Sequence, residues 1–177
     1  MDAMMLNKRL FRCEIYTESF RIEGKLEPMG EIVTALGDKR RSCMPVYDAI
    51  MTPISAHNPL NPITIPQLVI NKNNVVFVSL LDPADYEDVR LAPNVVVMTV
   101  YAGPFAIRGE FHLGGEMRVR DFVDTLTLDY TPITNVRFFP LVPTKASFTP
   151  SCPFVVLNKN LISAYCGEEA EDRGPQS

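Results

Sequence analysis

The chain has 177 residues, of which 46% are hydrophobic, and its formal net charge is −4. This much apolar material supports packed cores, so the composition excludes a wholly disordered chain. The negative charge gives no general attraction to the phosphate backbone of nucleic acids. No apolar run approaches the roughly 18–20 residues of a membrane span, and the N-terminal segment lacks the apolar stretch of a signal peptide. We therefore expect a soluble, cytoplasmic protein with reduced cysteines and no membrane partner.

An internal repeat runs through the chain at two similar offsets. Six residues between positions 16 and 31 recur 85 positions later, and seven residues between positions 45 and 73 recur 87 positions later. Thirteen matches in order exceed what compositional similarity supplies, and such repeats mark duplicated structural units. The repeat predicts a first domain over 11–82, a linker over 83–93 and a second domain over 94–166. The acidic residues 167–177 are expected to form a disordered tail.

Each copy is expected to open with two strands. The first strand is expected over 11–16 and, in the second copy, over 95–101. The second is expected over 20–26 and 105–111, where apolar and polar residues alternate as in a half-buried strand. A glycine inside the second strand, at Gly24 in the first copy, indicates a bulge or a sharp bend.

A short amphipathic helix is expected after the second strand of each copy. Apolar residues at helical spacing predict it, and Gly37 marks its end in the first copy. They are Ile32, Ala35 and Leu36 in the first copy and Val119, Phe122 and Val123 in the second.

Further strands and a closing corner complete each copy. Strands around 44–50 and 130–137 contain a proline near their start, which favours a strand start or an edge because proline cannot donate to a ladder. A proline-rich connection, which includes Pro66, follows in the first copy. Apolar runs on both sides of an Asn-Lys-Asn turn, over 68–78 and 155–165, predict a hairpin or a sharp strand-to-strand corner. The fold class is therefore mainly β with one short helix per copy.

This order of elements resembles the Sm-like small β-barrel, in which a glycine-containing second strand and a closing corner recur. Residues 20–24, 44–50 and 69–78 also resemble a pattern found in a family of short bacterial domains that has no assigned activity. The resemblance implies two tandem small Sm-like β-barrels. It does not carry RNA binding, because the Asp-x-x-x-Asn segment that reads RNA bases in Sm proteins is missing. The closing corner also departs from the Sm pattern, with Ile-Asn-Lys at 70–72 where that family has Ile-Arg-Gly.

The sequence contains no recognisable catalytic or metal-binding motif. The histidines, His57 and His112, fall at non-equivalent positions of the repeat, and the four cysteines lack metal-ligand spacing. Asp121 and Asp124 stand three residues apart on the second helix, where a solvated face explains them. We therefore expect no enzyme, no cofactor and no metal, and an enzyme is the least favoured interpretation.

The best polar candidates for a binding site are the two Asn-Lys-Asn corners, because they recur within the chain. Their residues are Asn71, Lys72, Asn73, Asn158, Lys159 and Asn160. One interpretation is turn chemistry, since Asn tolerates left-handed backbone and makes local hydrogen bonds. The other places a basic side chain at equivalent points of two barrels, where it meets an anionic or protein partner.

Two functions follow from these observations. The first is a structural or protein-interaction module that offers sheet edges to itself or to another protein. The second is an Sm-like nucleic-acid or nucleotide-binding regulatory protein. The net charge of −4, the absence of tryptophan and the lack of a basic run argue against the second.

Overall fold

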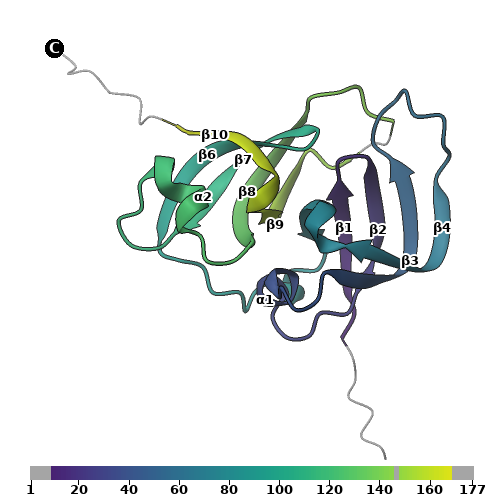
Figure 1. Cartoon of the computed structure of the whole chain (residues 1–177), viewed down its shortest axis with the longest axis horizontal. Helices are drawn as coiled ribbons and strands as arrows, with labels where there is room; N and C mark the ends of the chain where they lie inside the picture. Colours follow the sequence, from purple (N-terminus) through teal and green to yellow (C-terminus); the bar gives the residue numbers. More distant parts are fainter. Residues whose placement is uncertain (1–8, 146–147, 169–177) are drawn as a thin grey trace, which may run out of the picture.

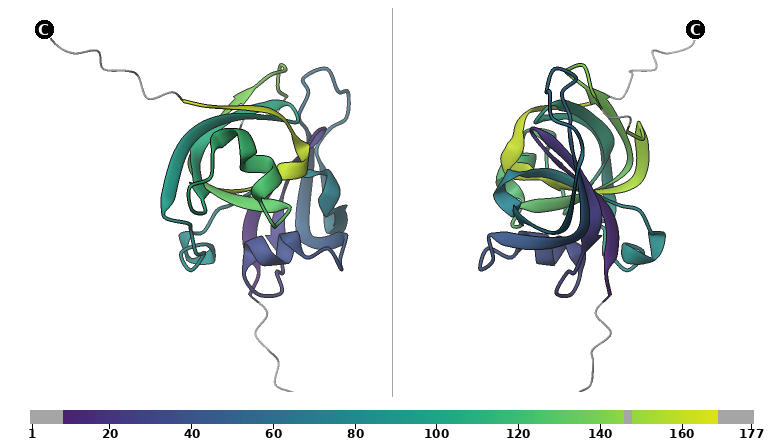
Figure 2. Two further views of the ribbon diagram at one scale, coloured as in Figure 1. Left: turned by 60° about the vertical axis from the view of Figure 1, so that its left-hand side comes forward. Right: turned by 90° about the vertical axis from the view of Figure 1, so that its right-hand side faces the viewer.

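The computed structural model describes residues 9–145 and 148–168. Its strands form one antiparallel sheet of ten, in the order β10-β6-β7-β8-β9-β5-β1-β2-β3-β4 (Figure 1). The prediction of a mainly β chain with short helices is therefore confirmed. The sheet is open, with β4 at one edge and β10 at the other, and it curves strongly within each half of the chain (Figure 2).

The first half supplies β1 to β5 and α1. Their bounds are β1 (Phe11–Thr17), β2 (Phe20–Leu26), α1 (Ile32–Gly37), β3 (Cys43–Pro53), β4 (Ile63–Asn71) and β5 (Val75–Leu80), with 3₁₀ turns η1 (Lys72–Asn74) and η2 (Pro83–Asp85). The second half has the same order of strands and α-helix, with an added 3₁₀ turn before the helix: β6 (Asn94–Ala102), β7 (Phe105–Leu113), η3 (Val119–Asp121), α2 (Phe122–Thr125), β8 (Tyr130–Pro140), β9 (Ser151–Asn158), η4 (Lys159–Leu161) and β10 (Ile162–Gly167). Along the sheet, the halves read β5-β1-β2-β3-β4 and β10-β6-β7-β8-β9.

The structure decides one open alternative and differs from one prediction. The run over 68–78 forms the sharp corner, the second of the two predicted alternatives, because β4 and β5 turn about η1 and then pair with different strands, β3 and β1. The proline-rich connection is shorter than predicted, because Pro66 lies inside β4. An edge strand accommodates proline, because the N–H that proline lacks is not needed on the side of the strand that has no partner. The predicted tail lies outside the described residues from residue 169 onward, and Gly167 ends β10.

The predicted glycine bulges are confirmed in both halves. The register between β2 and β3 shifts around Gly24, and the register between β7 and β8 shifts around Gly109. The facing strands carry Asp48 and Asn135 at φ 50° and 51°, a left-handed conformation that these two residue types tolerate better than most. A Cβ at Gly24 would lie 2.5 Å from Cγ1 of Val46, so the close approach of β3 requires glycine there.

The two halves exchange side chains across their junction. Tyr16 and Phe77 of the first half pack into the apolar core of the second half, and Tyr130 and Phe154 of the second half pack into the core of the first. The segment predicted as a linker also packs, because the ring of Tyr86 stacks on Phe154 at a centroid distance of 4.6 Å. The halves therefore form one continuous packed body.

Candidate functional site

The Asn-Lys-Asn corners lie at two of the 3₁₀ turns, η1 and η4. In each corner the first asparagine accepts a hydrogen bond from the backbone N–H two residues on, at 3.0 Å from Asn73 to Asn71 and 3.1 Å from Asn160 to Asn158. These bonds cap the turns and are the local chemistry that asparagine supplies at a strand-to-strand corner.

The lysines of both corners point back to the helix of their own half. The Nζ of Lys72, which is 5% exposed, donates to the carbonyl oxygens of Ala35 at 3.2 Å and Asp38 at 2.7 Å. Burial lowers the pKa of this ammonium. Lys159 is half-buried and donates to the carbonyls of Val123 and Leu126 at the end of α2. A lysine at the C-terminal end of a helix satisfies carbonyls that the helix itself leaves open.

Side chains of the second half bind backbone carbonyls at the corner of the first half. The hydroxyl of Tyr130 donates to the carbonyl of Lys72 at 2.6 Å, and Nδ2 of the buried Asn158 donates to the carbonyl of Val75 at 3.0 Å. Both bonds cross from one half of the chain to the other. The corners therefore contribute to the junction between the halves as well as to their own turns, whereas Asn71, Asn73 and Asn160 are exposed.

A half-buried ionic cluster lies on β1 and β2 beside this junction. Glu14 accepts hydrogen bonds from Arg21 at 2.6 Å and from the hydroxyl of Tyr16 at 2.7 Å, and Arg21 also pairs with Glu23. Burial and the Glu14 carboxylate raise the pKa of Tyr16 far above its usual range, so the phenol stays protonated. Arg21 and Tyr16 both occupy the Glu14 carboxylate, so the cluster orders the junction and leaves no free base or nucleophile among these groups.

The remaining polar groups also make structural contacts. The ring nitrogens of His112 lie 3.2 Å from the carbonyl oxygen of Ala92 and 2.9 Å from the hydroxyl of Thr134, so this histidine ties the segment before β6 to β8. Burial raises the pKa of the thiols of Cys13, to about 12, and of Cys152, to about 11. Thiols with such pKa values are poor nucleophiles.

Several concave surfaces surround α1. One of about 600 Å³ lies between the halves and includes Val33, Val89, His112, Tyr130 and Pro132. A larger one of about 950 Å³ lies on the first half alone, between the β2–α1 connection and residues 84–89. Their polar groups do not converge on a nucleophile with a base in hydrogen-bonding reach, as catalysis by a side chain requires. Over residues 9–145 and 148–168, no group of three or more His, Cys, Asp or Glu side chains is placed to hold a metal ion.

The two sheet edges form the remaining candidate site. Between the halves, β5 and β9 pair in antiparallel register at Phe77↔Leu157, Val78↔Val156 and Ser79↔Val155. The outer strands β4 and β10 each have one paired neighbour in the described sheet, β3 and β6 respectively. They are opposite edges of the strand order, and in Figure 1 β4 lies on the right of the first half while β10 crosses the front of the second half. Apolar side chains are exposed at and near the edges, among them Ile63, Val69 and Tyr101.

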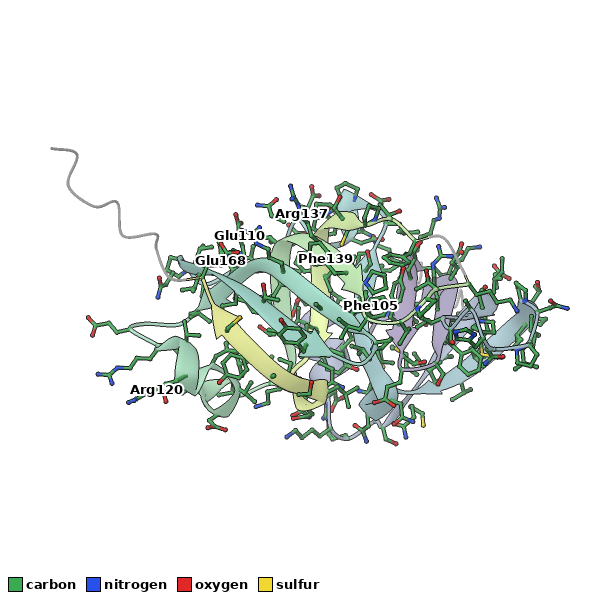
Figure 3. All side chains as sticks on the ribbon, turned by 90° about the horizontal axis from the view of Figure 1, so that it is seen from above. Phe105, Glu110, Arg120, Arg137, Phe139 and Glu168 are labelled. Atoms are coloured by element: carbon green, nitrogen blue, oxygen red, sulfur yellow. The ribbon has the colours of Figure 1, made fainter. Side chains whose placement is uncertain are left out.

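The outward side of the second half, in contrast, carries paired charges. Figure 3 shows Glu110, Arg137 and Glu168 along one rim of this half, and Phe105 placed toward the first half. Arg108 forms a two-pronged ion pair with Glu168 across the sheet, and Glu110 accepts a hydrogen bond from Asn135 at 2.8 Å. This rim is a solvated surface and does not compete with the edges as an apolar contact site.

Sequence reasoning missed the junction residues Tyr16, Phe77 and Tyr130. For Phe77 and Tyr130, the comparison of the two copies contains a sign of this role. Phe77 corresponds to Ala164 and Tyr130 to Cys43 at the offset of 87. Positions where one copy has a large aromatic and the other a small residue mark surfaces that are buried in one copy and open in the other.

The chain thus belongs to the broad class of open, antiparallel β proteins with helices at the strand connections. No family model, no curated protein and no solved structure matches it. Within the described part of the chain, none of the helices is both long and apolar enough to cross a membrane.

Proposed function

We propose that the chain is a non-catalytic protein-interaction module of the cytoplasm, built from two tandem Sm-like β-barrel halves that arose by duplication. It binds protein, either a second copy of itself or another chain, through the edges of its sheet. The observation that carries this proposal is the pair of open edges, β4 and β10, at the two ends of a single ten-stranded sheet.

An open edge presents unpaired backbone N–H and C=O groups, which another strand can pair with. Proteins that avoid such pairing place charges on their edge strands. Here β4 has the sequence Ile-Thr-Ile-Pro-Gln-Leu-Val-Ile-Asn and β10 has Ile-Ser-Ala-Tyr-Cys-Gly, and neither strand contains a charged residue. Pro66 is the one edge-blocking feature of β4. The four free cysteines fit a reducing compartment.

The nucleic-acid alternative, which comes from the Sm-like resemblance, would need a basic surface, and the structure offers only three consecutive cations for one. Lys39, Arg40 and Arg41 follow α1 on the surface, but Arg40 pairs with Asp38 and Lys39 with Asp129. A net charge of −4 and the ion pairs of two of these three cations leave little counterion release on contact with a phosphate backbone.

Light scattering after size exclusion, over a range of about 1 to 200 µM protein, tests the proposal together with a titration of single-stranded RNA at low and at physiological salt. We expect the average mass to rise above the 19.8 kDa of one chain with concentration, and RNA affinity to be absent. Micromolar RNA affinity that weakens steeply with salt, together with a constant mass of one chain, would refute the module and favour the alternative.

A further inference from the structure

We infer that the groove between the β2–α1 connection and residues 84–89 binds a peptide segment of another protein, in which lysine or arginine stands beside apolar residues. Its walls are residues 27–32 and 84–89, and Arg9 and Phe11 complete the lining. The volume of about 950 Å³ lies in the range of protein sites that hold ligands. The described lining includes no residue of β4 or β10, so this site goes beyond the proposed edge binding and is tested separately from it.

The floor of the groove is apolar. Phe11 and Ile32 are 8% and 1% exposed and belong to the core of the first half, and Val89 packs against that core. Met29, in contrast, is 69% exposed. Its Sδ accepts a hydrogen bond from Arg41, which lines a separate concavity, so Met29 stands at the boundary between the two. An exposed methionine beside an apolar floor offers a surface that adapts to apolar side chains of different shape.

The walls of the groove carry an excess of negative charge. Among the described residues that line it, four are carboxylates and one, Arg9, is a cation. Glu27 and Glu31 belong to one wall. Asp85 and Asp88 belong to the other. A cleft lined mainly by charge of one sign concentrates ligands of the opposite sign, so the groove favours a positively charged occupant.

Arg9 shows which kind of cation the groove accommodates. Its guanidinium carbon lies 5.2 Å from the centroid of the Phe11 ring. The same guanidinium pairs with Asp85 at 2.8 Å and donates to the carbonyl oxygen of Ala84 at 2.6 Å. An aromatic face, a carboxylate and a carbonyl together are the contacts that cationic side chains make in protein recognition. The chain thus places one such side chain in the groove itself.

The remaining carboxylates favour a peptide over a single small cation. Within residues 9–145 and 148–168, Glu31 and Asp88 form no ion pair, and they stand on opposite walls. In the same part of the chain, no group of three or more His, Cys, Asp or Glu side chains is placed to hold a metal ion. A metal ion or a small amine would pair with one wall, whereas a peptide with more than one cationic side chain reaches both.

Both walls are fixed before a partner binds. Glu31 accepts hydrogen bonds from two backbone N–H groups in the first turn of α1, at 3.1 Å and 3.2 Å. On the opposite wall, Asp82 caps the turn η2, and the stack of Tyr86 on Phe154 attaches this wall to the second half. A preformed groove loses little conformational entropy on binding, which leaves more of the contact energy for affinity.

A peptide selection on the 177-residue chain identifies the occupant. Displayed random peptides of about twelve residues, which extend over about 40 Å, are selected on the immobilised protein. We expect the selected peptides to be enriched in lysine or arginine next to apolar residues, and to bind with micromolar dissociation constants. Replacement of their cationic residues by glutamine should abolish binding. Selected peptides without an excess of cationic residues would overturn the inference.

Asp88→Lys and Met29→Ser test the charge and the apolar contact of the groove. Both side chains are exposed, so neither change should disturb folding, which circular dichroism in urea verifies. Asp88→Lys should weaken binding of a labelled selected peptide by at least about tenfold, and Met29→Ser by about threefold. Glu116→Lys is the matched control, because Glu116 is the exposed counterpart of Glu31 on the second half, and it should bind as the unmodified chain does. Unchanged affinity of Asp88→Lys would show that the inference is wrong.

Other binding modes give different results. Val69→Lys changes the β4 edge and should leave peptide binding unchanged. A peptide that binds Asp88→Lys but not Val69→Lys would pair with the edge, which overturns this inference and supports the proposed function. A lower average mass of Asp88→Lys than of the unmodified chain in light scattering would show that a second copy occupies the groove. Tighter peptide binding by Leu6→Asp would show that the chain's own residues 1–8 occupy it. Either of these two results would overturn the assignment of another protein's peptide.

Discussion

Replacing Lys72 by methionine distinguishes the two interpretations of the recurring corners. Methionine keeps an aliphatic stem of similar length but removes the ammonium that donates to the carbonyls of Ala35 and Asp38. Hydrogen bonds from a charged donor contribute about 1.5–3 kcal/mol each, and leaving buried acceptors open costs a similar amount. Removal of the ammonium also relieves the desolvation that lowers the lysine pKa, which offsets part of the loss. We expect Lys72→Met to lower the free energy of unfolding by about 2 kcal/mol.

The second corner supplies a graded comparison. Lys159 makes the corresponding contacts to α2 but is more exposed than Lys72, so Lys159→Met should cost about 1 kcal/mol. For a chain of this length, about 2 kcal/mol corresponds to a decrease in Tm of roughly 4–8 °C. Lys39→Met is the control, because the Lys39 side chain is 73% exposed and its ion pair with Asp129 is long, at 3.4 Å. It should change stability by less than about 0.5 kcal/mol.

Urea unfolding followed by circular dichroism measures these changes, and light scattering of the same variants measures assembly. Loss of stability with unchanged assembly would identify the lysines as helix caps. The capping argument would be refuted if Lys72→Met unfolded at the urea concentration of the unmodified chain. Unchanged stability with lost partner binding would instead favour the basic residues as a binding site.

Three further predictions concern the sheet and its core. Gly24→Ala should lower the free energy of unfolding by about 2 kcal/mol through overpacking, and Gly109→Ala by less than about 1 kcal/mol. The difference follows from the nearest contact of the added Cβ, which is 2.5 Å at Gly24 and 3.2 Å at Gly109. A Gly109→Ala chain that unfolds at a lower urea concentration than Gly24→Ala would contradict the bulge geometry. Phe77→Ala removes a ring that is 0% exposed and should lower the free energy of unfolding by about 3–5 kcal/mol. The chain should still unfold in one transition, and two separate transitions would show that the halves are independent. Burial raises the pKa of Cys13 to about 12, so at pH 8 Ellman's reagent should react with Cys43 but reach Cys13 only after denaturation. Because of the same shift, the Cys13 thiol loses its proton at a lower pH in the unfolded chain than in the folded one. The free energy of unfolding should therefore fall as pH rises above about 9, and this decrease should be smaller in a Cys13→Ala chain.

The local features of this fold could be predicted from the sequence because their causes are local. Alternation of apolar residues located the strands, and a glycine within a strand indicated the register shift that the structure has at Gly24. Pro66 was placed outside a strand because proline is rare within ladders. Only the position of β4 at the edge, a property of the whole sheet, makes it acceptable there.

The contacts that join the halves could not be predicted in this way. The Nζ of Lys72 reaches carbonyls 34 and 37 residues earlier in the chain, and no periodicity of the sequence specifies which carbonyls those are. Tyr16 follows Ile15 on β1, and both are buried, but they face the cores of different halves. A strand pattern shows that a side chain is buried, and only the partner strands determine where.

The internal joint, where β5 pairs with β9, and an external joint that the open edges form with a second copy differ in strength for a reason that the chain itself supplies. Phe77 and Tyr130 in the internal joint correspond to Ala164 and Cys43 at the open edges, so the external joint buries less aromatic surface and lacks the tyrosine bond to the Lys72 carbonyl. The internal joint also forms between halves linked by a short segment, at an effective concentration on the order of millimolar. An external joint with the same backbone pairs and smaller side chains has neither advantage. It should therefore be reversible, with a dissociation constant on the order of micromolar or weaker. The number of copies joined would then follow the local concentration of the chain, a dependence that a permanently closed oligomer would not show.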